Sequence, residues 1–198
     1  MPSGRPRRSR YVLQTINLPV SHWKGVQMAL FTASKQYDSL ESLFVDQLRD
    51  LYDAEQRLTK ALPKMVEAAH NPSLKTAIQQ HLRETQGQVK RLERVFELMG
   101  KNAQPETCEA MKGLISEGET VLSAKGDPNV KDAALIAAAQ RVEHYEIAGY
   151  GTARTFAQRL GKPEAARLLQ ETLDEEGATD KKLTQLAEQS INPKAERA

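Results

Sequence analysis

The sequence nearly repeats itself at a shift of 91 residues, and the repeat includes acidic residues at matched positions. Glu55 and Glu84 lie 29 residues apart, as do Glu146 and Glu175. Between residues 72 and 92 the same shift superimposes Pro72 on Pro163, Gln79 on Gln170, Leu82 on Leu173, Glu84 on Glu175, Lys90 on Lys181 and Leu92 on Leu183. Two similar helical hairpins, each with two carboxylates at one level, are one way to build a carboxylate-bridged metal site inside a four-helix bundle.

The composition favours an all-α fold. Charged residues make up 27% of the 198 residues and aromatic residues only 5%, which is typical of long helices with aliphatic seams. Cys108 is the only cysteine, so no intramolecular disulfide can form and a reducing compartment is favoured. No apolar run reaches the length of a transmembrane helix or of a secretory signal.

Apolar residues recur at intervals of three and four from Asp38 onward, which predicts two helical hairpins. Short breaks within each hairpin make its two helices antiparallel neighbours, whereas the 28-residue linker at residues 101–128 can cross the length of the bundle. We expect a bundle at residues 38–190 and a flexible tail at residues 191–198. The expected helices are Ser39–Ala69, Ser73–Met99, a short linker helix Glu106–Ser123, Asn129–Leu160 and Glu164–Gln189.

The first 37 residues carry all of the surplus positive charge, with six basic and no acidic residues against 22 basic and 26 acidic residues in the remainder. The opening segment is rich in Pro, Gly, Ser and Arg without a hydrophobic period, so we expect disorder. Its arginines could contact nucleic acid, although a solvated tail explains them more simply. Translation from Met28 is an alternative that would remove residues 1–27.

Glutamates interrupt the apolar seams of the predicted helices. Glu55 lies between Leu51 and Leu58, and Glu146 lies between Val142 and Gly149, while Glu84 and Glu175 lie nearer the seam margin. A carboxylate in a dry core costs several kcal/mol unless it is paired or binds a metal. A pair of iron or manganese ions suits oxygen-rich ligands. The alternative is that these glutamates reach solvent or pair with Arg57, Lys90 and Lys181.

Further polar side chains lie near the same level. Glu143 precedes Glu146 by one turn and is a fifth candidate ligand. His81 shares a helix face with Glu84, so it could be a ligand, a supporting partner of a ligand or a hydrogen-bonded filler. The tyrosines Tyr52, Tyr145 and Tyr150 could donate hydrogen bonds to the carboxylates. The candidate metal ligands are therefore Glu55, Glu84, Glu143, Glu146 and Glu175, and the candidate supporting residues are His81, Gln88, Tyr145, Glu176 and Asp180.

The stretch DAALIAAAQRVEHYEIAGYGTARTFAQRLG (residues 132–161), with HLRETQGQVKRLE (residues 81–93) and LRDLYDAEQRLTKALPKM (residues 48–65), resembles the YciE/YciF family of bacterial ferritin-like proteins. The resemblance covers residues 39–190. It implies a ferritin-like, rubrerythrin-like four-helix bundle with one long crossover, a homodimer, a cytoplasmic location and an association with stress.

The wider ferritin-like superfamily binds metal with a Glu-x-x-His motif on one helix of each pair. Three residues after Glu84 is Gly87, and three after Glu175 is Ala178, so both expected histidines are absent. The pair Glu143 and Glu146 does resemble the paired glutamates of rubrerythrin-type helices.

Three functions remain open from the sequence. The first is a dinuclear iron or manganese protein that acts on dioxygen or peroxide or that handles iron. The second is a metal-free structural or interaction module, and the third is a nucleic-acid-associated protein that uses the N-terminal arginines.

Overall fold

The structure, a computed structural model, describes residues 35–198. Residues 1–34 lie outside this range. The predicted disorder of that part of the N-terminal segment, and the alternative start at Met28, therefore fall outside the described residues.

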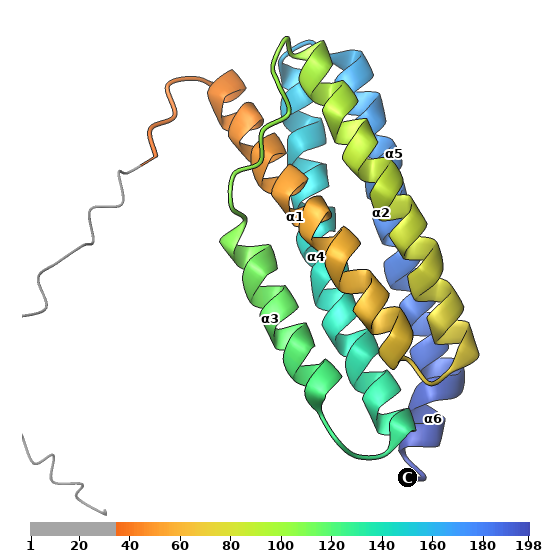
Figure 1. Cartoon of the computed structure of the whole chain (residues 1–198). Coiled ribbons are helices and arrows are strands. Elements are labelled where there is room, and N and C mark those ends of the chain that lie inside the picture. Colours follow the sequence, from red (N-terminus) through yellow and green to blue (C-terminus); the bar gives the residue numbers. More distant parts are fainter. Residues whose placement is uncertain (1–34) are drawn as a thin grey trace, which may run out of the picture. The chain divides into compact units, whose positions relative to one another are not determined.

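The described residues form long helices and no strand (Figure 1). The bundle comprises α1 (Leu40–Ala68), α2 (Pro72–Leu98), α4 (Pro128–Arg159) and α5 (Pro163–Leu186), with the short helix α3 (Glu109–Ser123) in the connection between α2 and α4. A π-helical turn, η2 (Ala187–Ile191), and the short helix α6 (Asn192–Ala195) follow α5. The predicted ferritin-like architecture, two hairpins with one long crossover that contains an extra helix, is confirmed.

Local signals define the helix ends. Ser39 and Ser42 form a reciprocal capping box at the start of α1, and Asn71 and Asp127 accept backbone N–H bonds at the starts of α2 and α4. A proline follows each of the latter two caps, at a position where a helix needs no N–H donor. The observed boundaries of the four long helices lie within three residues of the predicted ones.

The chain stays helical beyond the predicted end of the last helix. Residues 187–195 continue as η2 and α6, and Ile191 is buried in the apolar cluster that includes Leu58 and Val142. The start of the expected flexible tail at residue 191 therefore falls inside helical structure.

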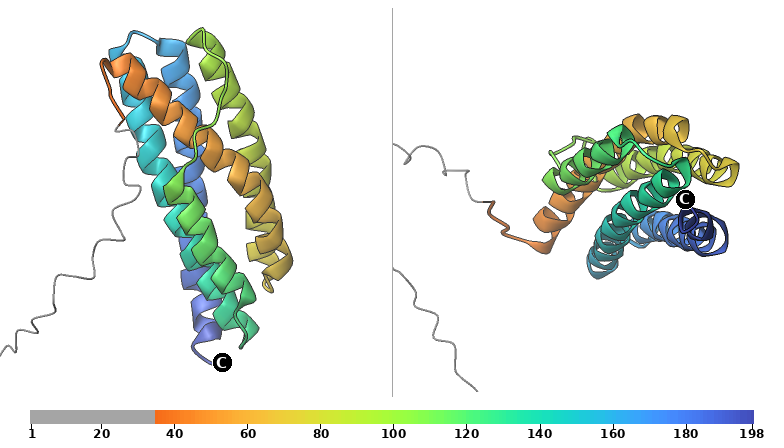
Figure 2. Two further views of the ribbon diagram at one scale, coloured as in Figure 1. Left: turned by 60° about the vertical axis from the view of Figure 1, so that its left-hand side comes forward. Right: turned by 90° about the horizontal axis from the view of Figure 1, so that it is seen from below.

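Each bundle helix packs on two others, α1 on α2 and α4, and α5 on α2 and α4 (Figure 2). The crossover runs beside α1, where the Glu106 N–H donates to the Arg49 carbonyl and the Cys108 N–H donates to Asp53. The helix α3 then packs against α1 and α4. At the opposite hairpin end, Asp132 accepts the backbone N–H groups of His70 and Asn71 at 2.8 and 2.7 Å.

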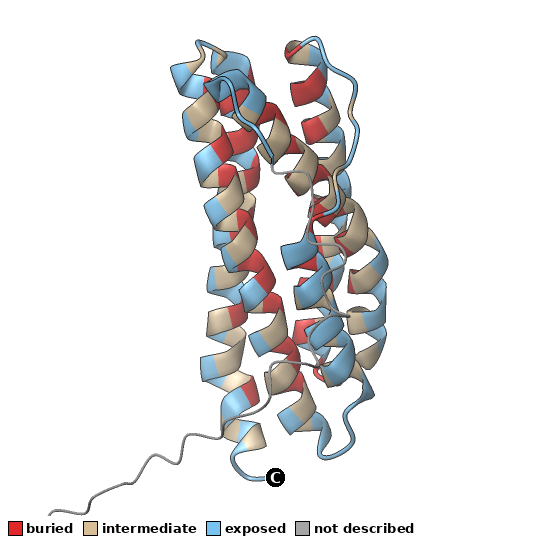
Figure 3. Cartoon of the chain, turned by 90° about the vertical axis from the view of Figure 1, so that its left-hand side faces the viewer, coloured by how far each residue is buried: buried red, intermediate tan, exposed pale blue. Residues whose placement is uncertain are grey.

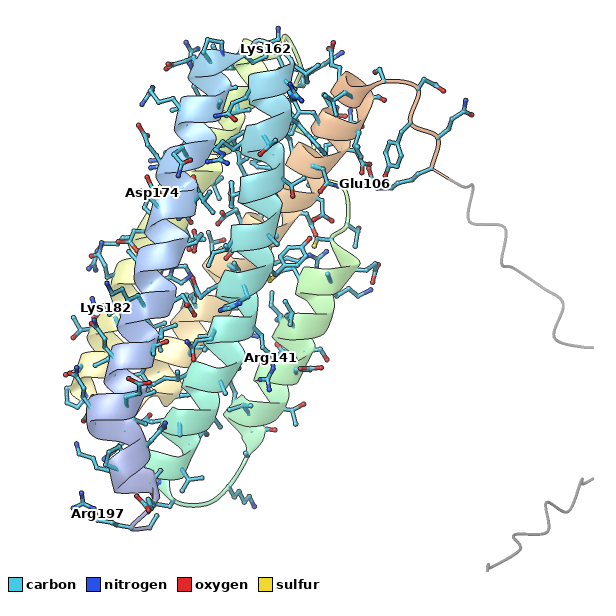
Figure 4. All side chains as sticks on the ribbon, turned by 180° about the vertical axis from the view of Figure 1, so that it is seen from behind. Glu106, Arg141, Lys162, Asp174, Lys182 and Arg197 are labelled. Atoms are coloured by element: carbon cyan, nitrogen blue, oxygen red, sulfur yellow. The ribbon has the colours of Figure 1, made fainter. Side chains whose placement is uncertain are left out.

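The apolar interior consists of two clusters rather than one. Figure 3 shows the buried residues distributed along the length of the helices. One cluster includes Leu51 on α1 and Tyr150 on α4, and the other includes Leu58 and Val142 on the same two helices. Glu55 and Glu146 lie in sequence between these pairs and are fully buried. Charged residues such as Arg141, Asp174 and Lys182, in contrast, point away from the bundle (Figure 4). A layer of buried polar side chains therefore separates the two apolar clusters.

Candidate metal centre

Buried polar side chains from all four bundle helices meet in this layer. His81 on α2, Glu143 and Glu146 on α4 and Glu176 on α5 each place one candidate ligand atom within 4.8 Å of the others. Glu55 on α1 is also fully buried and lies close enough to Glu146 and Glu176 for mutual charge repulsion. We call these five side chains the polar layer.

Close packing of α1 against α4 places Glu55 beside Tyr150. A Cβ atom on Gly149 would lie 2.8 Å from Leu51 Cδ2, so the missing side chain lets α4 approach α1 three residues after Glu146. The Tyr150 hydroxyl then donates a hydrogen bond of 2.5 Å to Glu55 Oε1. The sequence analysis named Tyr150 among the tyrosines that could donate in this way, and the other oxygen of Glu55 is buried without a hydrogen-bond partner among the described residues.

Most of the carboxylate oxygens and imidazole nitrogens of the layer have no hydrogen-bond partner among the described residues. His81 Nε2 lies 3.3 Å from Glu143 Oε1 but without the alignment of a hydrogen bond. The unpartnered atoms are Glu55 Oε2, Glu143 Oε2, both oxygens of Glu146, Glu176 Oε2 and both ring nitrogens of His81. Native proteins satisfy nearly all buried polar atoms, so a cluster of this kind requires a specific explanation. Three carboxylates and an imidazole whose ligand atoms lie within 4.8 Å of one another, with the carboxyl group of Glu55 nearby, fit the donor set of an oxygen-preferring transition metal.

The electrostatics of the layer follow from burial. Burial, and then the charge of neighbouring glutamates, raises the pKa values of Glu55, Glu143 and Glu146 well above their usual range. Burial raises the pKa of Glu176 to about 7, and burial lowers the pKa of His81 to about 4. The protein environment alone thus favours neutral acids and a neutral imidazole, and a bound cation would favour the ionised carboxylates instead.

Glu176 is held from outside by a chain of polar contacts. The side-chain amide of Gln88 donates to Glu176 Oε1 and, at 3.0 Å, to Glu175 Oε2. Arg91 in turn binds Glu175 through two N–H groups, with distances of 2.9 Å from Nη1 to Oε2 and 2.8 Å from Nη2 to Oε1. This chain fixes the carboxyl group of Glu176 in the interior.

The sequence-predicted residues divide into two groups. The structure brings together Glu55, Glu143 and Glu146 with the expected supporting residues His81, Gln88 and Glu176. Glu84 and Glu175 lie at the partly buried margin, where Glu84 accepts from Gln80 and Glu175 pairs with Arg91. Glu176 rather than Glu175 points inward, because one residue turns the side chain by about 100° around a helix.

Two of the expected supporting residues lie outside the layer. The Tyr145 hydroxyl donates to Asp50 and lies 2.9 Å from Cys108 Sγ, on the side of α4 that faces α3. Asp180 accepts from Gln140 and lies 3.4 Å from the exposed His144. Neither contacts a carboxylate of the layer through a hydrogen bond among the described residues.

Sequence reasoning missed Arg91 and Thr85. Arg91 replaces Arg57, Lys90 and Lys181 as the cation beside the paired glutamates. Thr85 is fully buried and, at the shift of 91 residues, corresponds to Glu176. Read one residue later, the Glu-x-x-His positions of the ferritin-like motif are Thr85 with Gln88 and Glu176 with Thr179. The three-and-four spacing of Ile78, His81, Thr85, Gln88 and Leu92 along α2 is the sequence signal that could have revealed this register.

Comparisons with known proteins agree with the predicted resemblance. Residues 39–196 match the family described as a domain of unknown function, DUF892. Protein YciF of Escherichia coli strain K12 is 49% identical over 159 residues, which cover 80% of this chain and 96% of that protein. None of the helices within residues 35–198 combines the length and apolar character needed to cross a membrane.

Solved structures show the same arrangement. The crystal structure of the E. coli stress protein YciF matches with a TM-score of 0.76 at 48% identity, covering 79% of this chain and 99% of that chain. YcfI from Rhodopseudomonas palustris, described as a candidate structural protein, matches with a TM-score of 0.74 at 44% identity, covering 76% and 96%. The sequence, the bundle and these matches together show that this chain belongs to the DUF892 family of YciF-like proteins.

Proposed function

We propose that the polar layer binds iron or manganese, as a dinuclear centre held by Glu55, Glu143, Glu146, Glu176 and His81. The cluster of buried donor atoms without hydrogen-bond partners is the observation that supports this proposal. Two divalent cations would balance the four carboxylates in charge. Bound iron or manganese would supply redox chemistry toward dioxygen or peroxide.

The protein's own residues have separate roles in this proposal. The carboxylates of α1, α4 and α5 and the imidazole of His81 would hold the cations, and the Tyr150 hydroxyl orients Glu55. Gln88, Glu175 and Arg91 hold Glu176 in place. The two apolar clusters above and below exclude bulk water from the layer.

Metal content of the purified full-length protein tests the proposal. The parent should retain about two iron or manganese ions per chain after growth with added iron. Glu55→Gln combined with Glu146→Gln should lose them while the helical content is unchanged. Glu84→Gln is the matched control, because Glu84 lies at the margin and should not affect the metal content. A folded parent that contains no metal after loading would refute the proposal.

That last result would favour the second candidate, a structural module. The two absent histidines of the Glu-x-x-His motif and the description of the Rhodopseudomonas relative support this alternative. A homodimer in the cytoplasm, implied by the family resemblance, is compatible with both candidates. Nucleic-acid binding by the N-terminal arginines remains a separate prediction, tested by salt-dependent DNA binding with and without residues 1–37.

A further inference from the structure

Two apolar cavities lie in the apolar cluster that includes Leu58 and Val142. The first, of about 30 Å³, lies between α3 and the bundle helices α1 and α4. Figure 1 shows how α3 covers these two helices. The walls of this first cavity are mainly aliphatic and include Leu58, Met65, Leu114, Ile115, Leu122 and Val142. The volume is large enough for one small guest molecule.

The second cavity, of about 10 Å³, lies inside the four-helix bundle and ends at the polar layer. Its aliphatic walls include Leu62, Ile78 and Leu183, and two members of the layer, His81 and Glu143, complete its lining. Met65 and Ala139 line both cavities. The two cavities therefore share a wall that consists of one small side chain and one flexible one.

The outer end of the first cavity adjoins a polar hollow of about 290 Å³ on the surface. Both spaces are lined by Ala61 and Ile115 and by the ion pair of Lys64 with Glu119, whose Nζ and Oε1 atoms lie 2.9 Å apart. Both charged side chains are more than half exposed, and an exposed pair of this kind contributes little stability. It can open and close at small cost.

We propose that the hollow and the two cavities form one access route, along which a small apolar molecule, foremost dioxygen, reaches the polar layer. The destination rests on the proposed metal-binding function, whereas the route itself does not. Empty cavities lined by aliphatic side chains stay dry and bind apolar guests. Hydrogen peroxide would find few hydrogen-bond partners between the surface ion pair and His81, so the lining favours dioxygen over peroxide.

Xenon tests the route in the metal-free, full-length protein, because it is apolar and binds in apolar protein cavities. We expect dissolved xenon to shift the methyl resonances of Leu58, Ile115 and Val142 in the first cavity and those of Ile78 and Leu183 in the second. Methyl groups of the other apolar cluster, such as Leu92, should not move. Unchanged methyl resonances around both cavities would overturn the proposal.

Two matched substitutions on α3 sharpen the test. Gly118 lines the first cavity, whereas Gly113 is exposed, and an added Cβ meets no other atom within 4 Å at either position. Gly118→Val should fill the first cavity and abolish the xenon shifts there, and Gly113→Val should retain them. Equal shifts in the two variants would contradict the route.

The shared wall provides a second variant. Ala139→Leu should keep the shifts of Ile115 and Leu114 and lose those of Ile78 and Leu183, because it closes the junction. Shifts in the second cavity that persist in this variant would show that xenon enters elsewhere, against the proposal.

Metal content, measured separately, distinguishes the route from its destination. Gly118→Val should bind as much iron as the parent and react more slowly with dioxygen but not with hydrogen peroxide. If the parent binds no metal, the proposed function fails, and the xenon shifts still decide whether the route exists.

Discussion

The hairpins α1–α2 and α4–α5 correspond in sequence, yet they contribute unequally to the polar layer. The first supplies one carboxylate, Glu55, together with His81, and the second supplies three, Glu143, Glu146 and Glu176. At the 91-residue shift, Tyr52 corresponds to Glu143 and Thr85 to Glu176, and all four side chains are buried.

The unequal number of buried carboxylates in the two hairpins distinguishes residues that the fold requires from residues that serve a function. The bundle accepts an uncharged side chain at these positions in its first half, so it does not need buried acids there. The carboxylates of the second half are costly to bury and have few internal partners. The proposed metal binding would account for their presence, and the contrast between the two halves makes that proposal testable.

Thr85→Glu, which gives the first hairpin the acid of the second, should have the largest effect. A further unpaired carboxyl group in this layer should destabilise the metal-free protein by about 3 to 5 kcal/mol. Urea unfolding measures this loss, and saturating Mn²⁺ should restore much of it. The isosteric Thr85→Val is the control, because it adds no charge. A similar loss in both variants would show that packing rather than charge dominates.

The stability of the metal-free protein should fall as the pH rises from about 4.5 to about 7. The folded-state pKa of Glu176 lies above its ordinary value of 4.5, so its contribution is complete below pH 4.5 and is lost as the pH rises through about 7. The loss from Glu176 alone is roughly 3 kcal/mol. The raised pKa values of Glu55, Glu143 and Glu146 act in the same direction.

His81 opposes this trend. Its pKa is lowered from 6.5 to about 4, so the stability that it contributes above pH 6.5 is lost as the pH falls through about 4. Thermal unfolding of the metal-free protein between pH 4 and 8 should still show a net decrease, because four acids outweigh one imidazole. Metal-loaded protein should show a flatter profile at neutral pH, and a stability that rises with pH in the metal-free protein would disagree with the burial of these acids.

Glu146→Leu should separate stability from function. Replacing a fully buried, unpartnered carboxyl group with an apolar side chain should stabilise the metal-free protein by about 2 kcal/mol at pH 8. The same variant should lose metal in an elemental analysis. Glu84→Leu, at the partly buried margin of the other hairpin, should produce neither change.

The smallest effect is expected at the supporting pair. Arg91→Lys removes the two-pronged contact with Glu175, and the partial exposure of both side chains limits the loss of stability to about 1 kcal/mol. Metal affinity should fall about tenfold, because Glu176 loses part of its support. A competition titration measures this change, and Arg167→Lys at an exposed pair should leave the affinity unaltered.

Much of the fold could be predicted from the sequence because its signals are local and repeated. Ser39, Asn71 and Asp127 cap the helices that the periodicity predicts, and Gly100 and Gly161, with φ values of 65° and 67°, end α2 and α4. The continuation through η2 was missed, because the burial of Ile191 depends on contacts with distant helices.

The site could be predicted only in part. Glu55 and Glu146 interrupt clear three-and-four series, so their inward direction is legible in the sequence. Glu175 and Glu176 are neighbours on a helix whose seam is broad, and packing against α2 decides which of them faces inward. The cavities beside Met65 are lined by side chains of three helices in one case and four in the other, and they leave no pattern in any one helix.

The interruption of the apolar interior halfway along the bundle has a mechanical consequence. Two hydrophobic cores joined through polar side chains hold the bundle least strongly at mid-length. In the absence of a ligand, each half could therefore unfold locally without the other. A cation held there would clasp all four rods at once. Reactivity and rigidity would then depend on the same few oxygen atoms, so that loss of the ion would soften the molecule at the place where it had been most tightly gripped.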